Sequence, residues 1–283
     1  MAVSAGDVKA LRDVTGAGMM DCKRALQEAE GDLEKAKDIL RQQGLAKGEK
    51  RAGRATAEGC VAVAVSPDHQ RVVAVELNCE TDFVGRTDDF RKMAQEIANK
   101  ALASGATEAE ALDVEPLINE AVSRMGEAIR VGRIFPLQAE GGNAVGHYLH
   151  TATHRVAVLV ELAIEGAVPA AAAAEVGREV GMQVAAMNPL CVCRQDVPAE
   201  RLERERNVLR QAADMANKPP QIQEKIIEGR LGKFYQEVCL VDQPYAKEAE
   251  KSVQQYLDEQ SKALGGKIGV ARFVRIEVGR ADG

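Results

Sequence analysis

The octapeptide VAVELNCE at residues 73–80 has a near copy 85 residues later, VLVELAIE at residues 158–165. In the first copy every second residue, Val73, Val75, Leu77 and Cys79, is apolar and lies on one face, which is typical of a strand with that face against a core. The flanking patterns also repeat. The first copy has a strand candidate before it at 60–65 and a helix candidate after it at 88–104, and the second copy has a strand candidate near 144–150 and a helix candidate near 169–187. The sequence therefore predicts an α+β fold with duplicated β-β-α core subdomains and antiparallel sheets.

Four segments can be drawn around this repeat. We expect a three-helix module with a basic linker at 1–54 and a first core subdomain at 55–140. A second core subdomain is expected at 141–195 and 241–283, with an insertion within it at 196–240. The insertion contains two polar-faced helical patterns around Lys218-Pro219-Pro220, and so predicts an antiparallel helical hairpin. Its apolar stripe has little core of its own and needs a partner, either in the same chain or in another copy.

The N-terminal module is predicted from helical spacing and turn residues. Val8, Leu11 and Val14 recur at helical spacing, and a glycine-containing turn at 15–18 precedes a second and a third helix. Beyond them, residues 47–54 are basic, rich in glycine and without periodicity. We expect an exposed linker there rather than a phosphate-binding patch.

The composition excludes several classes of protein. The 283 residues carry a formal net charge of −6 and only 3% aromatic residues, with no Trp. A global basic footprint for nucleic acid is missing, and few rings are present on which bases could stack. No apolar run approaches the length of a membrane span, and the N-terminal residues do not resemble a secretory signal. We expect a cytoplasmic protein with no direct contact to nucleic acid or membrane, and with six reduced cysteines.

Motifs for catalysis are missing from the sequence. It contains no P-loop, no G-x-G-x-x-G and no G-x-S-x-G. His147, His150 and His154 could bind a metal, but their segment reads as a strand and a turn, and we favour an exposed polar strand end. Cys191 and Cys193 form a C-x-C, which suits a buried strand better than a redox pair. No catalytic residue, metal site or cofactor is predicted.

Two short apolar features stand out. Residues 81–84, Thr-Asp-Phe-Val, lie between a strand and a helix, where a loop would ordinarily be polar. Phe83 can act as a staple that packs on the next helix, which is the favoured interpretation in isolation, or as a wedge for a partner's pocket. Met19 and Met20 follow a glycine turn; one fits the helical core, and the other must point elsewhere.

Three longer stretches carry a resemblance to a known family. They are TGAGMMDCKRAL at 15–26, ELNCETDFV at 76–84, and EGRLGKFY at 228–235 together with QPY at 243–245. In content and order they resemble the signatures of the elongation factor Ts family, and the resemblance covers essentially the whole chain. It implies a ubiquitin-associated-like N-terminal module, two related α+β subdomains and a helical-hairpin dimerisation arm. It also implies a guanine-nucleotide exchange factor for elongation factor Tu.

The resemblance further implies which residues meet elongation factor Tu. Phe83 would be a wedge beside switch II of the partner's G domain, where its entry disturbs the groups that hold Mg²⁺ and loosens the phosphate-binding loop. The implied contacts are Thr81, Asp82, Phe83 and Val84 at the Mg²⁺ site, Arg12, Met19 and Met20 on the same domain, and His150 on another domain. No bond is made or broken in such an exchange, so the chain is not expected to be an enzyme.

Two other classes of protein stay open at this point. One is an adaptor with a ubiquitin-associated-like module, whose core only scaffolds the arm. The other is a metal-dependent enzyme that uses the three histidines. Whether the arm forms a homodimer is also left open by the sequence.

Overall fold

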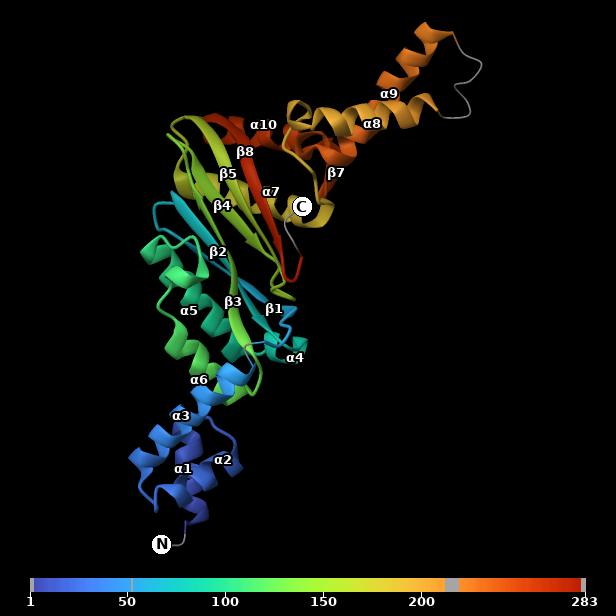
Figure 1. Ribbon diagram of the computed structural model, residues 1–283. Helices are drawn as coiled ribbons and strands as arrows, with labels where there is room; N and C mark the ends of the chain where they lie inside the picture. Colours follow the sequence, from blue (N-terminus) through green and yellow to red (C-terminus); the bar gives the residue numbers. More distant parts are fainter. Residues whose placement is uncertain (1–2, 52, 212–218, 281–283) are drawn as a thin grey trace.

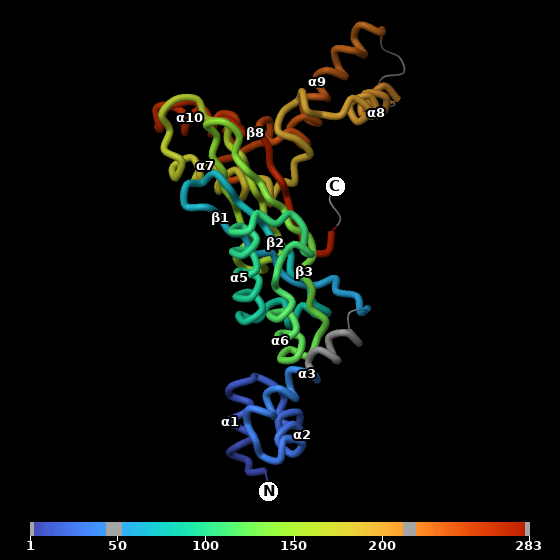
Figure 2. The backbone as a smooth tube through the Cα atoms, turned by 60° about the vertical axis from the view of Figure 1, so that its left-hand side comes forward, coloured from blue at the N-terminus to red at the C-terminus, as the bar shows by residue number. Residues whose placement is uncertain are grey.

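The computed structural model describes residues 3–51, 53–211 and 219–280. The molecule is elongated, with the three N-terminal helices at one end, the sheets in the middle and a pair of helices projecting from the opposite end (Figures 1 and 2). No helix of these described residues combines the length and apolar content that a bilayer crossing requires.

The N-terminal helices are α1 (Ala5–Thr15), α2 (Met19–Glu28) and α3 (Leu33–Arg51). Ser4 caps α1 through a capping box, and a small core that includes Leu11 and Leu26 joins the three helices. Val14, which follows Val8 and Leu11 at helical spacing, is exposed. The expectation of a linker without regular structure is wrong for residues 47–51, because their backbone continues α3. Most residue types in this stretch have a helix propensity that offsets the cost of one glycine.

Two three-stranded antiparallel sheets form the centre of the molecule. Their strands, in spatial order, are β1 (Glu58–Val65), β2 (Arg71–Cys79) and β3 (Ile129–Gln138) in the first sheet, and β4 (Ala144–Leu149), β5 (Val156–Gly166) and β8 (Gly266–Glu277) in the second. An α+β fold with antiparallel sheets is confirmed. The third strand of the first sheet, β3, was not among the strands expected from the sequence.

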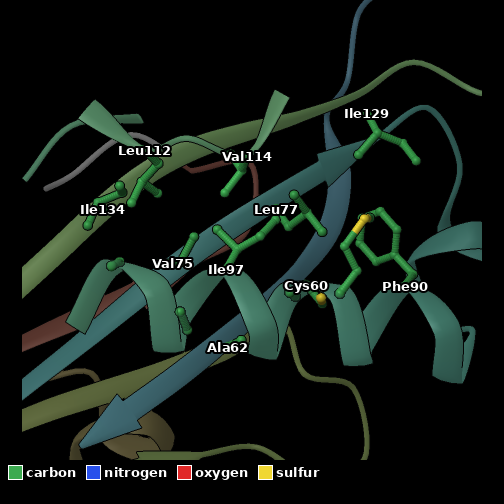
Figure 3. Packing of buried hydrophobic residues seen from close by; sticks show 14 of the residues in the cluster. Cys60, Ala62, Val75, Leu77, Phe90, Ile97, Leu112, Val114, Ile129 and Ile134 are labelled. Carbon is green, nitrogen blue, oxygen red and sulfur yellow. The ribbon is translucent and has the colours of Figure 1, made fainter. Parts of the chain in front are cut away.

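Helices cover the outer face of each sheet. They are α5 (Asp88–Ser104) and α6 (Glu115–Met125) on the first sheet, with η1 (Ala109–Ala111) between them, and α7 (Ala170–Met187) and α10 (Val253–Leu264) on the second. Figure 3 shows Phe90 and Ile97 of α5 packed on Val75 and Leu77 of β2. The alternation of the octapeptide decides this contact, because every second side chain of β2 faces α5.

The two sheets pack face to face through a third apolar cluster that includes Val61, Ala74 and Leu159. The hairpin turn of each sheet also binds the first strand of the other. The His69 carbonyl accepts a 2.8 Å hydrogen bond from the Val145 amide, and the His154 carbonyl accepts a 2.7 Å bond from the Val61 amide. Both histidines have φ of 55°. The sheets therefore hold each other in a reciprocal way.

A buried carboxylate at the inter-sheet face of each sheet strengthens this junction. Glu76 accepts bonds from Arg133 (2.9 Å) and from the Gly279 amide of the other sheet's end (2.9 Å). Glu161 lies at the matching place, with Arg272 at 2.6 Å and the Glu140 amide at 2.8 Å. A β-bulge lies beside each of these glutamates.

The insertion consists of α8 (Ala199–Arg210) and α9 (Pro220–Val238), which pack on each other. Lys218 of the predicted break, together with residues 212–217, lies outside the described residues. At the base of the pair, the backbones of Cys191 and Cys239 form an isolated β-bridge. Residues 194–196 then form the short helix η2 (Arg194–Asp196), so the strand expected at 191–193 is wrong. The chain then passes through η4 (Leu240–Asp242) and the small hairpin β6 (Pro244–Tyr245) and β7 (Glu248–Ser252).

The contact between α7 and β4 depends on two facing glycines. A Cβ added to Gly177 would lie 2.9 Å from the Cα of Gly146, which is backbone that cannot rotate away. We expect Gly177→Ala to lower the free energy of unfolding by about 2 kcal/mol, since overpacking a tight contact forces backbone shifts. Urea denaturation measures this change. As a control, Gly229→Ala in α9 meets open space and should be neutral or stabilising by up to about 1 kcal/mol.

Candidate functional site

Residues 81–84 form the tip of the first sheet. Here a four-residue helix, α4 (Asp82–Gly85), lies between β2 and α5. Thr81 is its N-cap, and the side chain accepts a hydrogen bond from the Val84 amide. Thr87 caps α5 in the same way through the Phe90 amide. The segment is therefore a capped turn with a fixed exit into α5.

The two large apolar side chains of this turn have different surroundings. Val84 is half-buried and packs on the core under α5. Phe83 is 81% exposed. The staple interpretation, favoured when residues 81–84 are considered alone, is thus wrong for Phe83 and suits Val84. A phenyl ring in water contributes nothing to the core, so packing of the first subdomain does not account for its place on the turn.

The turn is held firmly from beneath. Gly85 lies directly on Gly59 of β1, and a Cβ added to Gly85 would be 3.2 Å from the Gly59 backbone. The Cys79 thiol donates to the Thr81 carbonyl, with sulfur and oxygen 3.0 Å apart. Burial, together with the neighbouring Glu127 carboxylate, raises the pKa of Cys79 to about 12. The thiol stays protonated at neutral pH and can act as this donor.

Glu127, just before β3, reaches across to the beginning of the turn. One carboxylate oxygen accepts from the backbone amides of Glu80 (3.1 Å) and Thr81 (3.0 Å), and the other accepts from the Thr81 hydroxyl (2.5 Å). In return, the Glu80 carboxylate accepts from the Ala128 amide at 2.7 Å and pairs with Arg54 at 3.2 Å. No sequence pattern pointed to Glu127, because it lies in a short connection after Gly126 without periodicity.

Asp82 is at the exposed side of the turn. Its carboxylate pairs with Arg86 four residues later at 2.8 Å, and both side chains are solvent-accessible. An exposed pair of this kind contributes roughly 0.3–0.5 kcal/mol. Asp82 is therefore available to a partner at little cost to the fold.

The other expected contact residues lie elsewhere on the surface. Arg12 is exposed on α1, while Met19 and Met20 begin α2 and are 45% and 66% exposed. The expectation that one of the two methionines fills the helical core is wrong, because Cys22 and Leu26 occupy that core. Both thioethers are thus on the outer surface of the N-terminal helices.

His150 is half-buried in the turn between β4 and β5, with Nδ1 3.0 Å from the Thr153 hydroxyl. This turn ends near the same part of β1 that supports α4. Arg155 forms an ion pair with Glu58, the first residue of β1, whose neighbour Gly59 carries α4. The fold thereby places His150 and Phe83, 67 positions apart in sequence, on segments that border one end of β1.

The histidine cluster does not form a metal site. Among the side chains that the structure describes, no group of three or more His, Cys, Asp or Glu residues is placed to hold a metal ion. His147 lies within β4, and burial, helped by the neighbouring His69, lowers its pKa. The interpretation as a metal-dependent enzyme therefore has no support from the geometry.

Comparison with known proteins decides the family. A sequence model of the family described as Elongation factor TS matches residues 80–280. The chain belongs to the elongation factor Ts family. It is similar to the protein named Elongation factor Ts of Aquifex aeolicus, with 44% identity over 99% of each chain. It is also similar to that of Prosthecochloris aestuarii, with 44% identity over 98% of this chain and 99% of the relative, and to that of Trichlorobacter lovleyi, with 42% identity over 99% and 93%.

Membership of the elongation factor Ts family makes the chain a translation elongation factor. The matched region begins at Glu80 and so contains α4, the Glu127 contacts, the second sheet and the α8–α9 pair. The N-terminal helices lie before that region but within the alignments with these elongation factors Ts, which extend over nearly the full chain.

Proposed function

We propose that this chain is a guanine-nucleotide exchange factor that binds elongation factor Tu in its GDP form and promotes release of GDP. The single observation that carries the proposal is the exposed Phe83 on a turn that is anchored on all its buried sides. A rigid aromatic side chain loses little conformational entropy when it enters a pocket, and such residues dominate binding energies. Family membership supports the identity of the partner.

The mechanism follows from linkage. Phe83, with Asp82 beside it, enters near switch II and displaces the groups that hold Mg²⁺ against the phosphates of the nucleotide. A highly charged ligand then leaves faster, because its charge is no longer compensated. This chain and GDP·Mg²⁺ weaken each other's binding to elongation factor Tu to the same extent. The chain does no covalent chemistry in this scheme and requires no cofactor of its own.

Two further surfaces are assigned by the same proposal. Arg12, Met19 and Met20 contact the G domain, and the exposure of both methionines supports this, since thioethers adapt well to a binding surface. His150 contacts a different domain of elongation factor Tu. Its place beside the end of β1 supports a single binding face that includes α4. The proposed setting is the cytoplasm.

We also infer the finer organisation of the fold. The N-terminal helices would form a ubiquitin-associated-like module within 1–54, and the two sheets would be products of a duplication, in 55–140 and in 141–195 with 241–283. The matching glutamates, Glu76 and Glu161, support the duplication. The hairpin at 196–240 would be a dimerisation arm, which the exposed Val208 and Ile222 support.

A binding cycle tests the proposal. We expect the chain to bind nucleotide-free elongation factor Tu more tightly than the GDP·Mg²⁺ form, and GDP to bind the complex more weakly by the same factor. Titration calorimetry of both arms of the cycle gives the two ratios. An adaptor without exchange activity would bind both forms equally, and that result would refute the proposal.

A further inference from the structure

We infer that Glu127 is a positioning residue for the exchange reaction, one that fixes the α4 turn so that Phe83 is presented in a single orientation. This inference rests on the proposed function. Glu127 does not meet the partner in this scheme; it acts through the turn that carries the contact residues. Three features of the structure lead to it.

The first feature is the completeness of the contact. The carboxylate of Glu127 accepts three hydrogen bonds, two from consecutive backbone amides and one from the Thr81 hydroxyl. These are the groups at which β2 stops and α4 begins. Bonds to an ionised acceptor are roughly twice as strong as neutral ones, so one side chain holds the whole entry to the turn.

The second feature concerns the proton of the Thr81 hydroxyl. A hydroxyl has one proton and two lone pairs. The 2.5 Å bond to Glu127 takes the proton, so the oxygen turns a lone pair toward the Val84 amide, as its role of N-cap requires. Glu127 thus stabilises the cap of α4 although it is 46 positions from Thr81 in sequence.

The third feature is the contrast with the second sheet. The residue that follows β2 at the tip is Glu80, and it returns the contact of Glu127 by accepting the Ala128 amide. Its counterpart in the repeat, Glu165, is exposed near the end of β5, and its ion pair within the described part of the chain is with Lys267 across the strand ladder. The stretch after β5 carries no exposed aromatic residue. The reciprocal contact is found at the sheet end that presents Phe83.

The test uses the full chain and the release of labelled GDP from elongation factor Tu, measured over a range of factor concentrations. In the Glu127→Ala variant the turn is no longer held in place before binding and must become ordered when it meets the partner. We therefore expect the concentration of the chain that gives half-maximal GDP release to rise about tenfold, while the maximal release rate stays within about twofold. Glu127→Gln keeps one acceptor oxygen for the two amides but loses the acceptor of the Thr81 proton, so it should recover only part of the loss. Glu110→Ala, an exposed carboxylate on η1, is the matched control and should behave as the unmodified chain.

A double mutant separates positioning from general stability. In a Phe83→Ala background, Glu127→Ala should raise the half-maximal concentration by less than about twofold further, because the side chain to be positioned is gone. An equal effect in both backgrounds, or no effect of Glu127→Ala on the unmodified chain, overturns the inference. Failure of the unmodified chain to accelerate release would instead refute the proposed function itself.

Discussion

Replacement of Phe83 with alanine is expected to reduce the exchange efficiency on elongation factor Tu by roughly thirtyfold or more. Loss of an aromatic anchor in a binding site typically costs about 2 kcal/mol or more, which corresponds to that factor. The stability of the fold should not change beyond about 0.5 kcal/mol, since the ring is 81% exposed and packs on nothing in the core.

The decisive comparison for Phe83 is therefore between activity and stability. GDP-release kinetics and thermal unfolding are measured on the same preparation. Phe83→Leu keeps part of the apolar volume and should be intermediate in activity. Leu190→Ala removes an exposed apolar side chain far from α4 along the chain and should leave both quantities unchanged. If Phe83→Ala instead lowers the melting temperature sharply, the ring has a structural role, contrary to its exposure.

Glu161→Gln is expected to lower the free energy of unfolding by about 3 kcal/mol. Every partner of the Glu161 carboxylate is a donor: the Glu140 amide and the Asn143 side chain at 2.8 Å, and Arg272 at 2.6 Å. The NH₂ group of a glutamine must therefore face a donor inside the junction of the two sheets. An unmade bond and a broken buried pair carry costs of this size.

A control on the same strand makes this measurement sharp. Glu165 pairs with Lys267 across β5 and β8, and both side chains are largely exposed. Glu165→Gln should change the free energy of unfolding by less than about 1 kcal/mol. Urea denaturation at neutral pH compares the two variants. Equal effects would mean that burial of Glu161 does not matter, and the description of the sheet junction would then be wrong.

The contribution of Glu161 should also depend on pH. Burial alone would raise its pKa, but hydrogen bonds from Asn143, the Glu140 amide and Arg272 outweigh it, and the pKa is lowered from its ordinary value of 4.5. A carboxyl with a lowered pKa stabilises the fold fully above its unfolded value and loses this effect as the pH falls through the folded value. The difference between Glu161→Gln and the unmodified chain should be constant from pH 6 to 8 and shrink below pH 4.5.

The alternating octapeptide was enough to predict the centre of the fold. Its period of two residues assigned Val75 and Leu77 to the helix-covered face of β2, where they pack against α5. It could not predict β3, because residues 129–138 mix charged and apolar side chains and include Pro136, which usually argues against a strand. Here the proline is accommodated on an edge strand that pairs on one side only.

The candidate site was predicted only in part. An apolar pair at residues 83–84 signalled an unusual turn, but the sequence could not separate the exposed Phe83 from the packed Val84, since that depends on the direction of each side chain from α4. Glu127 could not be found at all. Its role arises from a contact between the connection after α6 and the end of β2, which are distant in sequence and meet only in the folded chain.

Exchange activity is tested most simply by the release of labelled GDP from elongation factor Tu in the presence of substoichiometric amounts of this chain and excess unlabelled nucleotide. We predict that all of the labelled GDP is released, faster than the spontaneous rate, with each molecule of the chain acting on many molecules of the partner. Release at the spontaneous rate at every concentration of the chain would mean that it is not an exchange factor for elongation factor Tu.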